Sequence, residues 1–336
     1  MDLIRLKHRL DTRLGIMAPV VMLMKNPTVR SLAIALRPII SHDSARHSQP
    51  VLVDYDPVVI LRSSGRRTPL WLVHPGVGEV LVFVGLAQHL SQDDRPVYAL
   101  RAKGFEVGQD RFPSIAVTVE TYVRAIRQRQ PRGPYALAGY SYGTMLAFEM
   151  AKKLNSDYGE NSVRFLSSFN LPPHIKTRMR YLNWNMCLLN LAYFVGLTTE
   201  EVADTCEEKG FRDVSRSEAL EQVLEVADRS RLEELGLGEL ELSRWAGVAF
   251  GLQSMSKDYD PDGLVDVIDI FHAIPLKVAA TSPEEWVTKH LSKWSDFCRT
   301  KPRFHRVGGA HYTMLGPDNV RGFSTTLQAA LGARGV

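Results

Sequence analysis

Gly139-Tyr140-Ser141-Tyr142-Gly143 follows an apolar run at residues 135–138 and precedes a helix-like segment at 144–154. In this context the stretch predicts a nucleophile elbow, a tight turn between a strand and a helix that projects the Ser141 hydroxyl out of a sheet. The two glycines are needed because side chains there would collide with the neighbouring strand and helix. Alone the pattern is weak, since an ordinary loop can carry it. Two further segments give it weight.

The first of these segments is LWLVHPGVG at residues 70–78. Its four leading apolar residues indicate a strand buried on both faces, and the proline and glycines that follow predict a turn before an amphipathic stretch at 79–90. We expect the backbone N–H groups of Val77, in this turn, and Tyr142, after the nucleophile, to form an oxyanion hole. Such a donor stabilises a tetrahedral oxyanion by about 3 kcal/mol, so its geometry matters more than its side chain.

The second segment is VGGAHYTML at residues 307–315, behind a strand-like run at 303–307. A serine far upstream and a histidine on a late glycine-rich loop predict that His311 takes the Ser141 proton and later returns it to a leaving group. A lone histidine is more often a packing or surface residue. We keep that interpretation for His74, expected to shape the oxyanion turn, and for His305, which lies in the strand.

Composition excludes several functional classes. The chain has 336 residues, of which 45% are hydrophobic, enough for one large α/β domain with an insertion. A net charge of +4 with scattered basic residues gives no reason to expect nucleic-acid binding. Three widely spaced cysteines argue against a disulfide framework or a zinc site, so we expect no metal and a reducing, cytoplasmic location. The apolar run at 14–24 lacks a cleavage site, and no stretch is long enough to span a membrane.

Strand and helix patterns alternate between residues 57 and 169, which predicts a doubly wound, mostly parallel sheet. The expected strands are 57–61, 70–74, 97–101, 134–138, 163–169 and 265–275, and the expected helices between and after them are 79–90, 115–130, 143–154 and 317–331. The alternation breaks at 171–264, where helical patterns at 177–194, 199–209, 217–227 and 239–255 have no strand between them. We interpret this insertion as a lid over the serine, with an extra packing bundle as the alternative.

The N-terminal 40 residues carry a different pattern. Leucines at 3, 6, 10 and 14 predict an amphipathic helix, and Asn26-Pro27 predicts the start of a second helix at 28–36. Residues 1–40 resemble the second half of a phosphopantetheine carrier domain, joined by a polar linker at 41–56 to the main domain at 57–336. In that family the serine that takes the cofactor precedes the helix matched by residues 2–13. The resemblance therefore implies that the chain itself is not loaded and that its acyl group comes from another carrier.

Residues 69–153, with the HPG turn and GYSYG, resemble type I thioesterase domains of nonribosomal peptide and polyketide synthases. FNLPPHIK at 169–176, with the carrier-like segment, resembles fungal synthetase-like enzymes built of adenylation, carrier and thioesterase domains. The resemblance implies an α/β-hydrolase fold with a helical lid at about 171–264. It also implies an enzyme of secondary metabolism that moves a carrier-bound acyl group to Ser141. Release is then by hydrolysis or by an internal or second acyl nucleophile, with no bound cofactor and with an acyl carrier or acyl-pantetheine as partner.

The sequence departs from that family at the acid of the catalytic triad. The family usually has an aspartate just after the strand that follows the nucleophile helix, and this chain has Asn170. An amide orients an imidazole but does not neutralise an imidazolium. Glu284, Glu285 or Asp296 is an alternative source of the acid, and each is also compatible with a solvated helix surface.

Three functions from different classes remain open at this point. The leading one is a thioester-cleaving or acyl-transferring enzyme. The second is a stand-alone esterase for free small-molecule esters, and the third is a non-catalytic remnant that docks carriers, which the Asn170 substitution favours and the intact Ser141 and His311 disfavour. Lys176, Arg178 and Arg180 are candidates to meet a carrier's acidic helix or the pantetheine phosphate, or they form a solvated face.

Overall fold

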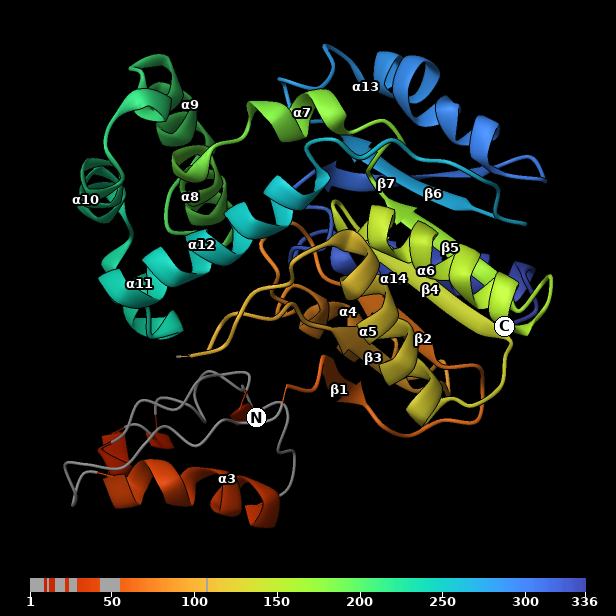
Figure 1. The fold of residues 1–336 in the computed structure, drawn as a ribbon, viewed down its shortest axis with the longest axis horizontal. Helices are drawn as coiled ribbons and strands as arrows, with labels where there is room; N and C mark the ends of the chain where they lie inside the picture. The colour runs from red at the N-terminus through yellow and green to blue at the C-terminus, as the bar shows by residue number, and fades with distance from the viewer. Residues whose placement is uncertain (1–8, 11, 16–21, 24–28, 43–54, 107) are drawn as a thin grey trace. The chain divides into compact units, whose positions relative to one another are not determined.

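The computed structural model describes residues 9–10, 12–15, 22–23, 29–42, 55–106 and 108–336 (Figure 1). The chain forms two compact units. One contains Tyr55–Lys103, Arg111–Tyr181 and Gly251–Val336, and the other contains Met1–Asp54, Gly104–Asp110 and Leu182–Phe250. The first unit carries the sheet and all the predicted catalytic residues.

The sheet has seven strands in the order β1-β3-β2-β4-β5-β6-β7. Its strands are β1 (Val58–Arg62), β2 (Leu70–Val73), β3 (Val97–Leu100), β4 (Tyr135–Tyr140), β5 (Val163–Phe169), β6 (Asp269–Ile274) and β7 (Arg303–Ala310). Only β1 runs antiparallel to its neighbour, and the other pairs are parallel. Every residue of the central strands β2 and β4 is buried, because helices cover both faces of a parallel sheet. The predicted mostly parallel α/β sheet is confirmed.

Several helices surround the sheet in this unit. They are α4 (Phe83–His89), α5 (Ile115–Arg129), α6 (Gly143–Tyr158), α7 (Lys176–Tyr181), α13 (Pro283–Glu285), η2 (Trp286–His290), η3 (Leu291–Phe297) and α14 (Val320–Ala333). Among them α5 packs on α6 and α14 packs on α4. In Figure 1, α5 and α6 lie together in front of the sheet, and α14, which contacts α4, lies behind it. The side chain of Ser114 accepts the Val117 N–H and caps α5. The helix α6 matters most for the site, because it begins directly after the predicted nucleophile.

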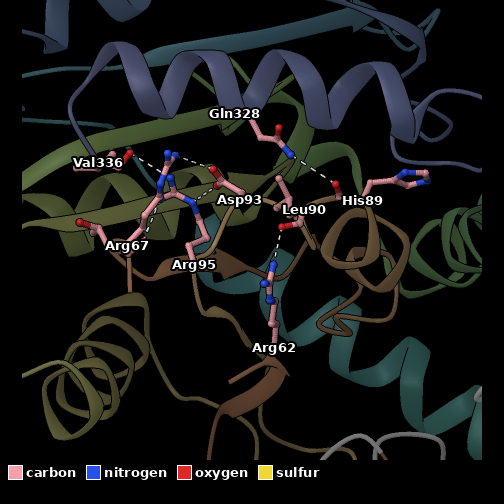
Figure 2. Close-up of polar contacts among 9 residues, drawn as sticks. Arg62, Arg67, His89, Leu90, Asp93, Arg95, Gln328 and Val336 are labelled. Carbon is pink, nitrogen blue, oxygen red and sulfur yellow. Dashed lines mark hydrogen bonds and ion pairs between the residues drawn. The ribbon is translucent and has the colours of Figure 1, made fainter. Parts of the chain in front are cut away.

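A buried arginine just before β3 joins residue Val336 to this part of the sheet (Figure 2). Arg95 is fully buried and donates hydrogen bonds to the carbonyl of Val336, at 3.0 Å, and to the carboxylate of Asp93. Gln328 of α14 donates to the backbone oxygen of His89, at the end of α4, at 3.4 Å. A buried guanidinium requires such partners, since an uncompensated buried charge is costly. These contacts hold α14 against the sheet.

The second unit is helical in its described part. It contains α8 (Trp184–Phe194), α9 (Glu200–Glu208), η1 (Phe211–Asp213), α10 (Arg216–Val226), α11 (Arg229–Leu235) and the first part of α12 (Glu239–Ser256). One predicted helix, at 177–194, is wrong: it is divided into α7 and α8, because the Asn183 side chain accepts the Met186 N–H and starts a new helix. The short helix α11, capped by Asp228, was not predicted. That this insertion acts as a lid stays a prediction.

Half of the predicted carrier-like segment at 1–40 falls on described residues. The predicted helix at 28–36 corresponds to α3 (Val29–His42), which is longer than the pattern indicated. Leu36 of this helix is buried, with Leu32 and Met22 packed against it. Most of the predicted helix at 2–13 and of the linker at 41–56 lies outside the described residues. In the described part of the chain, the structure contains no apolar helix of the length that a bilayer requires.

Candidate active site

The turn after β4 has the geometry of a nucleophile elbow. Ser141 has a φ of 51°, in the left-handed region that non-glycine residues rarely adopt. A Cβ added to Gly139 would lie 2.3 Å from the Gly143 carbonyl, and one added to Gly143 would lie 2.4 Å from the backbone oxygens of Val73 and His74. Both glycines are therefore required for the close approach of α6 to the sheet, which is the physical reason the sequence pattern predicted.

Ser141 and His311 meet at the carboxyl end of the sheet although 170 residues separate them. The Ser141 Oγ lies 3.0 Å from the His311 Nε2, within hydrogen-bond distance. The loop after β7 holds His311 by its backbone, because its N–H donates to the Ile274 carbonyl at 2.9 Å and its carbonyl accepts from the Tyr140 hydroxyl. The imidazole is 5% exposed. This pair can pass a proton between a hydroxyl and an imidazole.

The pKa of His311 is lowered to about 4, first by burial and then by the nearby positive charge of Arg178. A hydrogen bond with the backbone of Asn170 opposes both effects. The imidazole is therefore uncharged at neutral pH and is able to accept a proton.

Asn170 lies directly after β5, the position expected for the acid of a catalytic triad. It has a φ of 60° and is fully buried. Its Nδ2 lies 3.3 Å from the His311 Nδ1, and its Oδ1 accepts hydrogen bonds from the Trp286 Nε1, at 2.7 Å, and from the Ala273 N–H, at 3.3 Å. Sequence reasoning missed Trp286, which resembles an ordinary core residue 116 positions away from Asn170. The structure thus brings a serine, a histidine and an asparagine together.

None of the three alternative carboxylates is hydrogen-bonded to His311 among the residues that the structure describes. Glu285 instead accepts hydrogen bonds from the backbone N–H and the hydroxyl of Thr281 and pairs with Lys289 at 3.2 Å. These contacts lower the pKa of Glu285 to about 2, first through Thr281. Glu284 and Asp296 are exposed. In this structure the residue next to the His311 Nδ1 is uncharged.

The turn after β2 is built around a buried histidine, as predicted. His74 is fully buried, its Nδ1 lies 2.7 Å from the Pro75 carbonyl and its Nε2 lies 2.9 Å from the Tyr122 hydroxyl. A carbonyl is only an acceptor, so Nδ1 carries the proton and Nε2 accepts from Tyr122. Burial lowers the pKa of His74 to about 4, which keeps it neutral. The hydrogen bonds of His74 with Pro75 and Tyr122 therefore support this turn.

The predicted oxyanion donors stand at the two turns. Val77 follows the HPG sequence in a turn closed by a hydrogen bond of 2.9 Å from the Gly78 N–H to the Pro75 carbonyl. Tyr142 is the N-cap residue of α6, where backbone N–H groups have no partner within the helix. Its hydroxyl donates to the Leu252 carbonyl at 2.9 Å, which fixes the side chain away from the serine. The oxyanion role of both residues stays a prediction.

The three basic residues near the site differ in their partners. Lys176 pairs with Asp260 at 2.5 Å, and Arg180 pairs with Asp258 at 2.8 Å. The guanidinium of Arg178 lies 5.5 Å from the centre of the Tyr181 ring. Lys176 and Arg180 are therefore already neutralised by aspartates of the same unit, which weakens the hypothesis that they bind a carrier's acidic helix.

A pH profile provides the first test of this site. Because the pKa of His311 is about 4 instead of 6.5, we expect the rate of Ser141 labelling by a fluorophosphonate to be constant from about pH 8 to about pH 5 and half-maximal near pH 4. The protonated imidazole cannot accept the serine proton, so the rate falls on the acid side. A half-maximal rate near pH 6.5 would contradict the low pKa.

The pH profile needs a control for acid unfolding, because protonation of the two buried histidines also destabilises the fold. In the folded protein His74 and His311 both have a pKa of about 4, whereas the unfolded value is 6.5. The unfolded chain therefore binds more protons in this window, and the free energy of unfolding falls as the pH decreases from 6.5 toward 4. Tryptophan fluorescence recorded at each pH separates a loss of base from a loss of fold.

Comparison with known proteins gives matches over most of the chain. Residues 68–331 match the family model of the thioesterase domain. The nonribosomal peptide synthetase atrA of Aspergillus terreus is 52% identical over 100% of this chain and 35% of its own length. For the aspulvinone E synthetase melA of Aspergillus terreus, the identity is 47%, with the same shares. The atromentin synthetase nps3 of Serpula lacrymans is 42% identical over 100% of this chain and 34% of its own length. This chain thus spans about a third of each of these relatives.

Solved structures confirm the fold. A four-domain nonribosomal peptide synthetase, holo-AB3403 bound to AMP and glycine, superposes with a TM-score of 0.65 at 18% identity, over 97% of this chain and 23% of that chain. The Vlm2 thioesterase domain bound with a dodecadepsipeptide superposes with a TM-score of 0.60 at 21% identity, over 81% of this chain and 96% of that chain. The predicted α/β-hydrolase architecture is therefore the one that this site is built on.

Proposed function

The chain belongs to the thioesterase-domain family, and from that premise we propose that Ser141 takes an acyl group from a phosphopantetheine thioester on a carrier domain. The single observation that carries the proposal is the 3.0 Å contact of the Ser141 Oγ with the His311 Nε2 at a nucleophile elbow. The family and its fungal synthetase relatives make the chain an acyl-transferring serine enzyme of secondary metabolism. The same proposal includes that the acyl donor is the phosphopantetheine of an acyl carrier and that the protein acts in the cytoplasm.

The proposed chemistry has two halves. Ser141 Oγ attacks the thioester carbonyl while His311 Nε2 accepts the hydroxyl proton, and the same proton then goes to the departing pantetheine thiol. The negative charge on the carbonyl oxygen meets the backbone N–H groups of Val77 and Tyr142. In the second half, water or a second acyl nucleophile gives its proton to His311 and attacks the ester carbon, and Ser141 leaves as the hydroxyl. The phosphopantetheine arrives with the carrier and departs with it.

The experiment compares one acyl group in three forms. One test acyl group, phenylpyruvyl, is presented as a thioester of a holo-carrier domain, as a thioester of free pantetheine, and as a methyl ester. We expect kcat/KM to be at least about tenfold higher for the carrier thioester than for pantetheine, because docking adds binding energy realised near the reacting atoms, and lowest for the ester. Mass spectrometry should place the acyl mass on the peptide that contains Ser141.

Each alternative function has its own outcome in that comparison. Turnover of the methyl ester as fast as that of the carrier thioester would establish a stand-alone esterase. Absence of both the acyl mass and fluorophosphonate labelling, with retained binding of the carrier domain, would establish a non-catalytic docking remnant. The acyl mass on a residue other than Ser141 would overturn the assignment of the nucleophile.

A further inference from the structure

The Asn170 side chain is held in one orientation by groups that can only donate. The Trp286 Nε1–H and the Ala273 backbone N–H both point to one atom of the amide, at 2.7 Å and 3.3 Å. An indole N–H and a peptide N–H have no acceptor capacity, so that atom must be the amide oxygen. The amide NH₂ therefore faces His311, whose Nδ1 lies 3.3 Å from it. Because all four groups are buried, no bulk solvent is available to change this arrangement.

This orientation decides which ring nitrogen of His311 carries the proton. The amide NH₂ is a donor, so the Nδ1 that faces it has to be an acceptor. The proton of the neutral imidazole then lies on Nε2, the nitrogen 3.0 Å from the Ser141 Oγ. In that tautomer Nε2–H donates to the serine and does not accept its proton. An asparagine in place of a protease triad aspartate fails for this reason and lowers kcat by about 10⁴-fold.

The opposite tautomer also has a partner. The backbone of Asn170 forms a hydrogen bond with the same imidazole that raises the pKa of His311, so this backbone group acts as an acceptor. An acceptor at Nδ1 favours the tautomer that carries its proton there. Residue 170 therefore contributes two competing contacts: its side-chain NH₂ favours the tautomer that leaves Ser141 inactive, and its backbone favours the tautomer that activates it. The Trp286 hydrogen bond strengthens the first contact because it prevents the amide from presenting its oxygen.

We propose that Trp286 is a positioning residue that turns the Asn170 amide toward His311, keeps the active tautomer in the minority, and so slows the reaction of the acyl-enzyme with water. The inference rests on the proposed acyl-enzyme at Ser141. Water must give a proton to His311 Nε2 as it attacks the ester, and a weakened base slows that step. A nucleophile with a more acidic proton than water depends less on the base. The slow ester then survives until such a second substrate reaches it.

The surroundings of residue 170 fit a carboxylate equally well. In Asn170→Asp, one oxygen would accept hydrogen bonds from Trp286 and Ala273, and the other would accept a hydrogen bond from the His311 Nδ1–H. Three donors offset the cost of burying the charge. We expect this variant to hydrolyse the acyl-enzyme at least 10²-fold faster, and the protease comparison sets about 10⁴-fold as the upper limit.

Trp286→Phe provides an independent test that keeps the ring and removes only the N–H. Freed from the indole, the amide can turn its oxygen to His311 Nδ1, so we expect acyl-enzyme hydrolysis to accelerate several-fold. A merely structural tryptophan predicts the opposite sign. The matched control is Trp294→Phe, because Trp294 is as buried and its Nε1 donates at 2.8 Å to the carbonyl of Leu171, the next residue along. This control should leave the hydrolysis rate unchanged.

The tautomer is read directly by ¹⁵N NMR of histidine-labelled protein, with the His311 signals identified by their loss in His311→Gln. We expect an unprotonated Nδ1 in the wild type and in Trp294→Phe, a protonated Nδ1 in Asn170→Asp, and a mixture in Trp286→Phe. Circular dichroism confirms that each variant is folded. If Asn170→Asp does not fold, the Trp286→Phe result and the wild-type spectrum decide the question.

Two results would overturn the proposal. One is a wild-type His311 that carries its proton on Nδ1. The other is a folded Trp286→Phe, or a folded Asn170→Asp, whose acyl-enzyme hydrolyses no faster than the wild type. Failure of the proposed function is separate from these, since it appears as an absence of acyl mass on Ser141 while the NMR result is unaffected.

Discussion

Replacing Ser141 with alanine is expected to abolish the acyl-enzyme and to lower thioester turnover by about 10²-fold. The size of this expected loss follows from the absence of a carboxylate next to His311. In subtilisin, loss of the serine costs about 2 × 10⁶ in kcat and loss of the aspartate alone about 3 × 10⁴, so a site that already lacks the charge retains a factor of roughly 70 to lose with its nucleophile. Intact-protein mass spectrometry after incubation with the pantetheine thioester measures the first effect, and steady-state kinetics measure the second.

The control for this variant is Ser324→Ala. Ser324 is a buried serine of α14 whose hydroxyl donates to the Arg321 carbonyl, at 2.8 Å, within its own helix. The Ser324→Ala protein should be acylated by the thioester and labelled by a fluorophosphonate to the same extent as the wild type. A Ser141→Ala protein that still acquires the acyl mass would show that another residue is the nucleophile. A loss of about 10⁶-fold in turnover would show that a carboxylate orients and stabilises His311, a role that Asn170 does not provide.

Replacing Gly143 with alanine is expected to cost more than about 4 kcal/mol in the free energy of unfolding, enough to prevent folding of a domain of ordinary stability. The added methyl group would lie 2.4 Å from the backbone oxygens of both Val73 and His74. Backbone atoms cannot rotate away as a flexible side chain can, so α6 would have to move off the sheet. Urea denaturation followed by fluorescence measures the change, and low soluble yield is the extreme result.

Gly322→Ala is the matched control for that substitution. It lies inside α14, and an added Cβ meets no atom within 4 Å. Since glycine is unfavourable in a helix, alanine should stabilise the protein there by about 0.5–1 kcal/mol. An unchanged urea midpoint for Gly143→Ala would mean that the contact between α6 and β2 is looser than the structure has it.

The sequence predicted the strands well where the pattern was local. Four consecutive apolar residues form β2, and the apolar run before the serine forms β4, because strands buried on both faces need apolar side chains at every position. The prediction was poorer at β6, expected at 265–275 and observed as Asp269–Ile274. The strand order was beyond prediction, because pairing joins segments far apart in the chain and leaves no local pattern.

In the site, as in the sheet, short sequence motifs were predicted and contacts between residues far apart in the sequence were not. The elbow around Ser141 and the glycine-rich loop of His311 are short motifs, so each could be recognised by itself, and Asn170 could be located by its place after β5. The contact between Trp286 and the Asn170 amide could not be recognised, because it joins residues 116 positions apart and a tryptophan in a helical pattern normally indicates core packing. Sequence reasoning thus found the participants and missed the group that orients one of them.

The left-handed backbone at Ser141 and Asn170 has a consequence for laboratory evolution. Both residues hold φ values, 51° and 60°, that cost non-glycine residues about 1 kcal/mol or more. Glycine at position 141 would relieve that cost, whereas glycine at position 170 would leave the buried N–H groups of Trp286 and Ala273 without their acceptor. A screen that rewards only heat resistance would therefore enrich glycine at position 141, where chemistry is proposed to occur. Such a screen would return robust proteins with no activity. Libraries for improving this enzyme should therefore keep codons 141 and 170 fixed and seek stability elsewhere, for example in α14.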